Sequence, residues 1–407
     1  MLARIGMERI VIIGAGQAGC QAVASLRAAG FAGAITLVGD EPFQPYQRPP
    51  LSKAYLMGAM ERERLFLKPD AFYAEARCEM ATGIAATAID RAARTVALAD
   101  GRKLVYDKLL LATGSRVRKI KVPGADLPGI FYLRGIADVD ALRPALAAAK
   151  HLAVVGGGYI GLEVAAVARK LGHRVTVIET LDRVMARAVS KPMSDFYERV
   201  HREAGVEFAM NTAVEGFEGR GKLEAVRAGG VSVAADVALI GIGVIPNCEL
   251  AQAAGLACND GIQVDKHCAT ADAAIFAAGD CTRHHGRAGD LIRLESVQNA
   301  IDQAKHAALA MAGQPAPYSE VPWFWSDQYD LKLQIAGLAK PGDTLVQRGD
   351  PATRKFAVFH LREGRIAAVE AVNAAPEYLM GRKLIADAAA VAPERLADIS
   401  IPMKSIV

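Results

Sequence analysis

The sequence predicts an α/β protein with two Rossmann-like dinucleotide-binding domains, and two glycine fingerprints carry this prediction. GAGQAG begins at Gly14 and GGGYIG begins at Gly156, and each follows an apolar run that is typical of a buried strand. After each fingerprint come a helix-forming stretch and a second apolar run that leads into an acidic residue. One such motif is weak on its own, whereas two copies with the complete order of strand, turn, helix, strand and acid favour dinucleotide binding. We therefore expect the chain to bind two dinucleotides.

Length and composition agree with this fold class. The chain has 407 residues, enough for two or three domains at roughly 100 to 200 residues each. It is 52% hydrophobic and 23% charged and holds 38 glycines, as expected of an α/β protein with glycine turns. The net charge of +4 comes without a basic stripe, which argues against a nucleic-acid partner. No run reaches the roughly 20 apolar residues of a membrane span, so we expect none.

The six cysteines are scattered, without a CxxC pair or a metal-ligand spacing. This pattern predicts a reducing compartment, and we assign the chain to the cytoplasm. Cys281, His284 and His285 are interpreted as ordinary loop residues, because zinc needs three or four converging ligands. The charge-free stretch 10–26 is not interpreted as a signal peptide, because three glycines and two glutamines interrupt it. The segment before Met7 is expected to be a short extension.

The first fingerprint assigns a separate task to each glycine. Gly14 is expected to make the tight turn after the strand RIVII, Gly16 to let the backbone approach a pyrophosphate, and Gly19 to let the helix pack on the strand. The helix that follows presents N–H groups and a positive dipole end to phosphate. The next strand, AITLV, leads to Asp40, which is placed to accept a hydrogen bond from a ribose hydroxyl.

The second fingerprint repeats these tasks with Gly156, Gly158 and Gly161. Its following strand, HRVTVIE, ends at Glu179. A carboxylate at this position accepts both ribose hydroxyls of NAD and repels a 2′-phosphate. No arginine lies directly beside it, since Arg183 comes four residues later, so we predict NADH at the second site.

Further motifs extend from one end of the chain to the other. The strands KLLLATGS at 108–115 and AAIFAAGDC at 273–281 recur in flavoproteins that bind two dinucleotides. With PYQRPPLSKAYL, GGGYIGLEVAA, GVIPN, RLESVQNAIDQAK and PWFWSDQYDLKLQIAGL, they form a specific set. On these motifs the chain resembles the FAD- and NADH-dependent ferredoxin reductases of bacterial oxygenase systems.

The resemblance implies a glutathione-reductase-like architecture. Residues 7–115 and 247–320 would form a discontinuous FAD-binding domain, 116–246 an inserted NADH-binding domain, and 321–407 a smaller α+β C-terminal domain. The resemblance also implies site residues, position by position. For FAD these are the first fingerprint with Asp40, Arg48, Lys53, Thr113, Arg134, Gly279, Asp280, Val297 and Trp325, with Glu295 in the same turn as Val297. For NADH they are the second fingerprint with Glu163 and Glu179.

The segment QPYQRPPLSK at 44–53 lies where related enzymes that reduce disulfides or peroxides carry a reactive cysteine near the flavin. Residues 42–60 contain no cysteine, so electrons cannot leave through a thiol of this segment. They are predicted to pass to an external one-electron acceptor. The two prolines are expected to stiffen the turn before a helix that begins near Leu51.

Lys53, Glu163 and Trp325 are the predicted catalytic residues, in the sense that they position and stabilise the reacting cofactors. The resemblance places Lys53 near flavin N5, where a cation would stabilise negative charge, and pairs it with Glu163. Trp325 would lie beside the isoalloxazine ring. Trp323 and Trp325 share a face if their segment is a strand, so two buried core aromatics remain an alternative.

The implied partner is a 2Fe–2S ferredoxin that supplies a cytochrome P-450 or an aromatic-ring dioxygenase, and we expect a monomer or weak dimer. Candidate docking charges for an acidic ferredoxin are Arg62, Arg64, Arg287, Arg293, Arg382 and Lys383. Two alternatives remain open. One is an NADH oxidase or rubredoxin reductase, and the other is an NADH-responsive flavoprotein similar to apoptosis-inducing factor.

Overall fold

The computed structural model describes residues 8–406. The extension expected before Met7 therefore lies outside the described residues. The chain forms two compact units, one from residues 8–47, 62–116 and 244–320 and the other from 48–61, 117–243 and 321–406.

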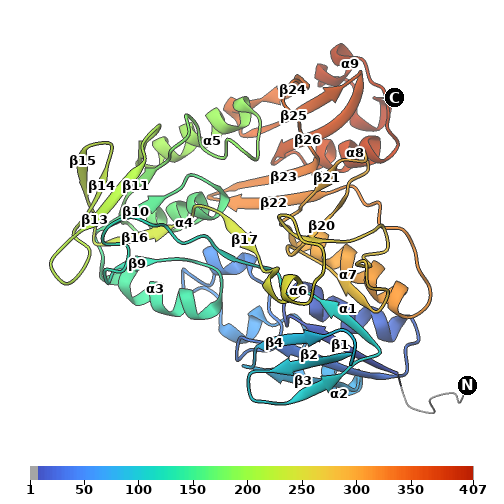
Figure 1. Ribbon diagram of the computed structural model, residues 1–407. Coiled ribbons are helices and arrows are strands. Elements are labelled where there is room, and N and C mark those ends of the chain that lie inside the picture. Colours follow the sequence, from blue (N-terminus) through green and yellow to red (C-terminus); the bar gives the residue numbers. More distant parts are fainter. Residues whose placement is uncertain (1–7, 407) are drawn as a thin grey trace, which may run out of the picture. The chain divides into compact units, whose positions relative to one another are not determined.

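The first unit is built on a parallel five-stranded sheet with the order β19-β7-β1-β2-β3, of which β1, β2 and β3 are labelled in Figure 1. Its strands are β1 (Arg9–Ile13), β2 (Ala34–Gly39), β3 (Cys78–Thr82), β7 (Lys108–Leu111) and β19 (Ile275–Ala277). Its helices are α1 (Gln17–Ala28), α2 (Asp70–Glu75), α6 (Glu249–Ala253), α7 (Val297–Met311) and the 3-10 turn η2 (Arg62–Leu65). Smaller sheets contain β4 (Ala86–Asp90), β5 (Thr95–Leu98), β6 (Lys103–Val105), β8 (Ser115–Val117), β17 (Val244–Pro246), β18 (Ile262–Gln263), β20 (Thr282–His285) and β21 (Leu291–Ile292).

Both faces of this sheet are buried, as the all-apolar strand RIVII requires. Ile10 and Ile12 of β1 pack in a cluster with residues of α1 and α7. Val11 and Ile13 point to the opposite face and pack with residues of β4, β5 and β6. Because successive side chains of a strand alternate between faces, an unbroken apolar run fits only a sheet that is covered on both sides.

The second unit contains a parallel sheet of the same design, with the order β12-β11-β10-β16-β9. Its strands are β9 (Ile130–Phe131), β10 (His151–Val155), β11 (Arg174–Ile178), β12 (Val206–Ala209) and β16 (Val237–Ile240). Helices α3 (Ile136–Ala148), α4 (Tyr159–Lys170) and α5 (Lys191–Glu203) accompany it, with a meander of β13 (Val214–Glu218), β14 (Ala225–Ala228) and β15 (Val231–Ala234).

The remainder of the second unit is an antiparallel sheet with the order β22-β23-β26-β25-β24. Its strands are β22 (Trp323–Gln328), β23 (Leu331–Gly337), β24 (Thr344–Asp350), β25 (Lys355–Arg362) and β26 (Arg365–Val372). The helices are α8 (Ala375–Ala386) and α9 (Pro393–Ala397), with the 3-10 turns η3 (Pro351–Thr353) and η4 (Met403–Ser405). The predicted combination of two Rossmann-like parts with an α+β C-terminal part is confirmed.

The segment after Arg48 differs from its prediction. The helix expected near Leu51 is instead a 3-10 turn, η1 (Pro49–Ser52), followed by further turns up to Gly58. The two prolines at the start have no backbone N–H to donate. The backbone hydrogen bonds that follow differ in spacing, since the N–H of Tyr55 donates to the carbonyl of Pro50 and the N–H of Met57 donates to that of Lys53. The segment therefore does not form a regular α-helix.

Candidate functional site

Both glycine turns lie at the point where the strand order of their sheet reverses. In the first sheet, Ile12 of β1 pairs with Leu37 of β2 on one side and Leu110 of β7 on the other. In the second sheet, β10 lies in the same way between β11 and β16. Ligands of open α/β sheets bind outside the carboxyl ends of the strands at this switch point.

In the first turn, the structure distinguishes the three glycines by their surroundings. Gly14 has φ +119°, and a Cβ there would lie 2.0 Å from the carbonyl oxygen of Ala112. A Cβ on Gly19 would lie 2.0 Å from the carbonyl oxygen of Gly14, so only glycine lets α1 approach the turn. The Cβ position of Gly16 is open, with no atom within 4 Å. The turn thus leaves free the one place where a pyrophosphate must approach the backbone.

The second turn has the same construction. Gly156 has φ +104°, and a Cβ there would lie 2.4 Å from the carbonyl oxygen of Gly241. A Cβ on Gly161 would lie 2.3 Å from the carbonyl oxygen of Gly156. The Cβ position of Gly158 is again open. No side chain caps the first turn of α1 or of α4, so their N–H groups remain available to phosphate. The residues present therefore fit two dinucleotides.

The Gly158→Ala variant is expected to fold normally and to bind NADH weakly. Gly158 has φ −79° and open space at its Cβ, so a methyl group should cause no strain but should occupy the place predicted for the pyrophosphate. We expect the KM for NADH to rise by about tenfold or more, with little change in Tm. Gly156→Ala is the contrasting variant, in which the clash and the positive φ should lower Tm. Equal losses of Tm in both variants would contradict these assignments.

Glu179 is held at the carboxyl end of β11 beside the second turn. Its carboxylate accepts hydrogen bonds from the backbone N–H of Gly157 at 2.7 Å and of Leu181 at 2.8 Å, and from the Thr180 hydroxyl at 3.1 Å. The guanidinium of Arg183 donates to two backbone carbonyls of its own loop, at 2.8 and 2.9 Å. Arg183 is thus held by carbonyl oxygens of its own loop, and the carboxylate of Glu179 lies beside the glycine turn. Because a carboxylate there repels a 2′-phosphate, this arrangement supports NADH rather than NADPH.

The acid of the first unit occupies a different position. The first glycine of each turn donates its N–H to the end of the second strand, to Val38 in one unit and Ile178 in the other, at 2.8 Å in both. Gly39 is therefore the structural counterpart of Glu179, and a Cβ on Gly39 would lie 2.5 Å from the side chain of the alanine after the first glycine. The carboxylate comes one residue later, at the exposed Asp40. Its predicted bond to a ribose stays a prediction.

The predicted FAD residues of the segments 108–115 and 273–281 lie close together in the first unit. Asp280 accepts a hydrogen bond from the Ser115 hydroxyl at 2.8 Å. Thr113 and Asn247 are joined by two hydrogen bonds, from the Thr113 hydroxyl at 2.7 Å and from the Asn247 amide at 2.8 Å. Gly279 has φ +87° and follows β19. These contacts bring the ends of β7, β17 and β19 together.

Helices α1 and α7 meet at Gly279. A Cβ on Gly279 would lie 3.5 Å from both Ala18 of α1 and Ala300 of α7, so the AGD motif adjoins the first fingerprint. Val297 is the first residue of α7, and Glu295 just before it is exposed and forms an ion pair with Arg293. The structure places these predicted FAD residues in one region, and their individual roles stay predictions.

In the second unit, Arg48 of the segment QPYQRPPLSK contacts Arg134, another predicted FAD residue. The guanidinium of Arg48 donates to the carbonyl oxygen of Arg134 at 2.6 Å. Arg134 precedes α3, and its N–H donates to the Asp138 carboxylate at 2.8 Å. The two arginines, which are far apart in sequence, are thus direct neighbours.

Lys53 and Glu163 form an ion pair, as the resemblance implied. The Lys53 ammonium lies 2.7 Å from the Glu163 carboxylate, and Glu163 is only 3% exposed. The same carboxylate accepts hydrogen bonds from the hydroxyls of Ser52 and, at 2.7 Å, Ser326. A buried carboxylate is stable only when paired and hydrogen-bonded, and here three donors meet that need. Ser52 and Ser326 were missed by sequence reasoning, because an isolated serine carries no pattern.

Trp325 lies in the strand that carries Ser326. Trp323 and Trp325 share one face of β22, with ring centroids 5.6 Å apart, which confirms the expected alternation. Phe324 on the other face lies 4.5 Å from the ring of Tyr159 at the start of α4. The contact of Trp325 with a flavin stays a prediction.

All six cysteines belong to the first unit. All six are free thiols, and burial raises the pKa of Cys248 and Cys281 to about 11, which keeps them protonated at neutral pH.

Within residues 8–406, no three His, Cys, Asp or Glu side chains are grouped as metal ligands would be. In the same residues, no helix is long and apolar enough to cross a bilayer.

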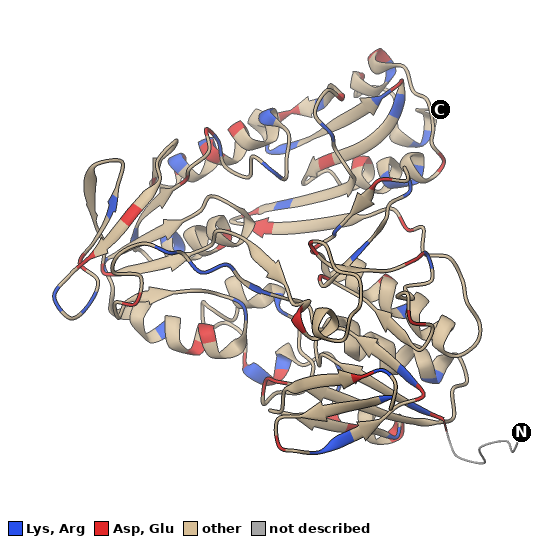
Figure 2. Ribbon diagram, in the orientation of Figure 1, with Lys and Arg blue, Asp and Glu red and all other residues tan. Residues whose placement is uncertain are grey.

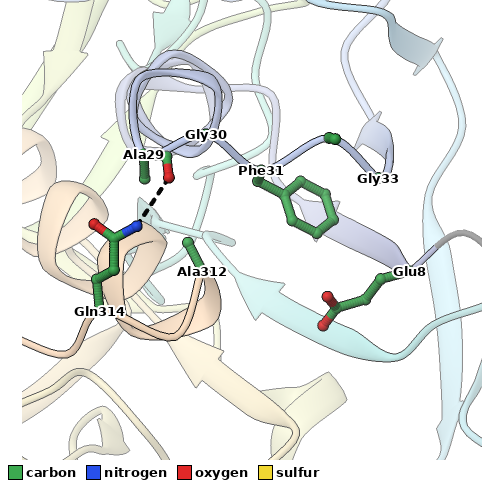
Figure 3. Close-up of a pocket in the computed structure, with 8 residues that line it drawn as sticks. Glu8, Ala29, Gly30, Phe31, Gly33, Ala312 and Gln314 are labelled. Atoms are coloured by element: carbon green, nitrogen blue, oxygen red, sulfur yellow. Dashed lines mark hydrogen bonds between the residues drawn. The ribbon is translucent and has the colours of Figure 1, made fainter.

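A surface hollow of about 470 Å³ lies in the first unit (Figure 3). Glu8 at the amino end of β1 and Ala29 and Gly30 after the end of α1 line it, and the Gln314 amide donates to the Ala29 carbonyl across it. Because α/β sheets bind ligands at the carboxyl ends of their strands, this hollow is at the wrong edge for a dinucleotide.

Positive and negative residues are interspersed along the chain (Figure 2). Among the candidate docking charges, Arg293 forms ion pairs with Asp260 and Glu295, and Arg382 lies over the ring of Trp323. Lys383 lines an apolar hollow between α8 and η4. Lys383 therefore combines charge with an adjoining apolar surface.

Comparison with known proteins adds the family. Residues 8–304 match the pyridine nucleotide-disulphide oxidoreductase family, and residues 323–407 match the reductase C-terminal family. Rhodocoxin reductase of Rhodococcus erythropolis is 46% identical over 97% of this chain and 93% of its own length. Putidaredoxin reductase CamA of Pseudomonas putida is 42% identical over 98% and 97%. The ferredoxin–NAD(+) reductase component of the anthranilate 1,2-dioxygenase system of Burkholderia cepacia is 44% identical over 98% and 99%.

Solved structures agree with these relatives. The reductase in the covalent putidaredoxin reductase–putidaredoxin complex matches with a TM-score of 0.95 and 42% identity, over 98% of both chains. The ferredoxin reductase of the CYP199A2 system from Rhodopseudomonas palustris matches with a TM-score of 0.95 and 41% identity, over 98% of this chain and 99% of that one. With matches over nearly its whole length, the chain belongs to the pyridine nucleotide-disulphide oxidoreductase family, among the ferredoxin reductases of bacterial oxygenase systems.

Proposed function

We propose that this chain is an NADH-dependent ferredoxin reductase that delivers electrons to a 2Fe–2S ferredoxin, which in turn supplies a cytochrome P-450 or an aromatic-ring dioxygenase. The observation that carries this proposal is the pair of glycine turns of the same construction, one in each unit. Two dinucleotide sites in one chain suit a transfer of electrons between FAD and NADH. The relatives named above reduce ferredoxins according to their names, which supports the same partner here.

Each part of the chain has a proposed task. FAD is held by residues 7–115 and 247–320, NADH by 116–246, and residues 321–407 complete the enzyme. Bound FAD would supply the redox chemistry, since a flavin can take up a hydride from NADH and release the electrons one at a time. The protein's contribution is to bind, orient and exclude water, since this chemistry needs no protein nucleophile.

The residues of the second unit have specific proposed roles. The N–H groups at the start of α4 bind the pyrophosphate of NADH, and Glu179 accepts hydrogen bonds from its ribose hydroxyls. Lys53, fixed by Glu163, presents a positive charge where negative charge develops during electron transfer. Arg48, Arg134 and Trp325 are proposed FAD contacts on the basis of the resemblance.

We propose the cytoplasm as the site of action. Six free cysteines in one chain suit a reducing compartment, since an oxidising one favours disulfides.

Anaerobic stopped-flow mixing of the holoenzyme with NADH tests the proposed function directly. We expect rapid bleaching of the flavin band, followed by fast electron transfer to an added 2Fe–2S ferredoxin and only slow reaction with oxygen. Brisk oxygen consumption without transfer to ferredoxin would indicate an oxidase instead. A long-lived reduced complex that reacts with neither would indicate a sensor-like flavoprotein.

A further inference from the structure

A line of polar side chains crosses the interior of the second unit and ends on Glu163. The Tyr329 hydroxyl lies 3.1 Å from Nδ1 of His201, and Nε2 of His201 lies 2.8 Å from Oε1 of Gln328. The Gln328 amide nitrogen donates to the Ser326 hydroxyl at 3.2 Å, and that hydroxyl donates to Glu163 at 2.7 Å. The line therefore joins β22 and helices α5 and α4 through four consecutive hydrogen bonds.

The chemistry of the groups sets one direction for all four hydrogen bonds. An amide oxygen only accepts, so Nε2 of His201 carries the hydrogen and donates to Gln328. In a neutral imidazole Nδ1 is then the acceptor, so the Tyr329 hydroxyl donates to it. Burial lowers the pKa of His201 to about 4 and raises that of Tyr329 to about 12, so both stay neutral at working pH. Each donor points along the chain toward the Glu163 carboxylate.

The surroundings show that these polar groups depend on one another. Ser326 and His201 are fully buried at 0% exposure, and Gln328 is 2% exposed. An unsatisfied polar group at such a position is costly, and aligned hydrogen bonds polarise and strengthen one another. Tyr329 occupies the hairpin turn between β22 and β23 with φ +55°, a conformation that favours glycine or asparagine. The side chain that supplies the outermost donor thus sits at a strained backbone position, with its ring 4.9 Å from that of His201.

We propose that the chain of Tyr329, His201, Gln328 and Ser326 is a positioning device that holds the Glu163 carboxylate, and through it the Lys53 ammonium, in the orientation required for hydride transfer from NADH. This inference rests on the proposed function of the Lys53 and Glu163 pair. Glu163 divides its two oxygens between two tasks. One oxygen accepts a hydrogen bond from the Ser326 hydroxyl, while the other accepts one from the Ser52 hydroxyl and pairs with the Lys53 ammonium. Anchoring the first oxygen fixes the plane of the carboxylate and therefore the place of the cation.

The device predicts a graded series of effects. Ser326→Ala removes the donor that touches Glu163, Gln328→Met removes the next link, and Tyr329→Phe removes only the outermost hydroxyl. The measurement is the limiting rate of flavin reduction in anaerobic single turnovers of the FAD-loaded enzyme with NADH. We expect this rate to fall by about tenfold in Ser326→Ala, by several-fold in Gln328→Met and by less than about twofold in Tyr329→Phe. The Kd for NADH should remain within about twofold, and Ser326→Thr, which keeps the hydroxyl, should restore most of the rate.

Ser190→Ala is the matched control. The Ser190 hydroxyl donates to another buried carboxylate of the same unit, Glu370, at 2.5 Å, and Glu370 is 1% exposed. This variant should lose Tm to a similar extent as Ser326→Ala, yet keep its rate of flavin reduction. A general packing defect would slow both variants equally.

The inference is overturned if Ser326→Ala and Gln328→Met reduce flavin no more slowly than Ser190→Ala, or if Ser326→Thr is as slow as Ser326→Ala. If Ser326→Ala does not retain FAD, the comparison of Gln328→Met with Tyr329→Phe decides, since equal rates in both contradict the gradation. These measurements need no ferredoxin. A wild-type enzyme that NADH reduces but that fails to reduce ferredoxin would overturn the proposed partner and leave the positioning device in place.

Discussion

Replacing Lys53 with alanine is expected to slow the reduction of the flavin by NADH by about a hundredfold, the scale of losing one preorganised electrostatic group at a reacting centre. Lys53 is 21% exposed and is fixed by an ion pair of 2.7 Å to a carboxylate that is itself buried. A fixed cation needs no reorganisation when negative charge develops, so it contributes more than a mobile surface lysine. The measurement is the limiting rate of flavin bleaching in anaerobic stopped-flow with saturating NADH.

The same experiment separates charge from position. Lys53→Arg keeps the charge and should retain part of the rate, although a guanidinium does not reproduce the geometry of an ammonium. Lys191→Ala removes an exposed lysine that is paired with Asp195 on α5, and it should leave the rate unchanged. If Lys53→Ala reduces its flavin as fast as Lys191→Ala, Lys53 does not act at the reacting centre.

Replacing Glu179 with arginine is expected to lower the ratio of kcat/KM for NADH over NADPH by about a hundredfold or more. The change exchanges a carboxylate that repels a 2′-phosphate for a guanidinium that binds one. Glu179→Ala should produce a smaller change in the same direction, because it removes the repulsion without adding an attraction. Steady-state kinetics with both nucleotides and a fixed artificial acceptor measure the ratio.

Glu207 provides the control for Glu179. It lies on the neighbouring strand β12 and is an exposed carboxylate paired with Arg174 at 2.9 Å. Glu207→Ala should leave the ratio of NADH to NADPH efficiency within about twofold of the wild type. A ratio that stays constant in Glu179→Arg would show that another residue selects the nucleotide.

The sequence alone determined the two Rossmann-like parts and the tasks of their glycines. Most of these tasks depend on contacts within the motif, such as the approach of Gly19 to Gly14 and the open backbone at Gly16, which explains why six residues predict them. The exception is the space that Gly14 needs beside Ala112, which comes from a distant part of the chain. The acid after the second strand is equally local, so Glu179 was correctly placed at the end of β11 and beside the second turn. The wrong prediction, a helix near Leu51, also has a local cause, because the two prolines favoured a helix start but the next residues formed mixed turns.

Only the tertiary structure decided how the second unit surrounds Glu163. Ser52, Glu163 and Ser326 are more than a hundred residues apart from one another in the chain, and they meet because β22 packs on α4 next to the turn η1. The resemblance supplied the pair of Lys53 and Glu163, but neutral residues such as Ser326 and His201 carry neither charge nor periodicity that a sequence pattern could register. Local sterics and apolar periodicity depend on neighbouring residues, so the sequence by itself determined the dinucleotide turns. A chain of hydrogen bonds forms only after distant segments have packed and excluded water. The fold alone therefore decided which residues hold the Lys53 ammonium in place.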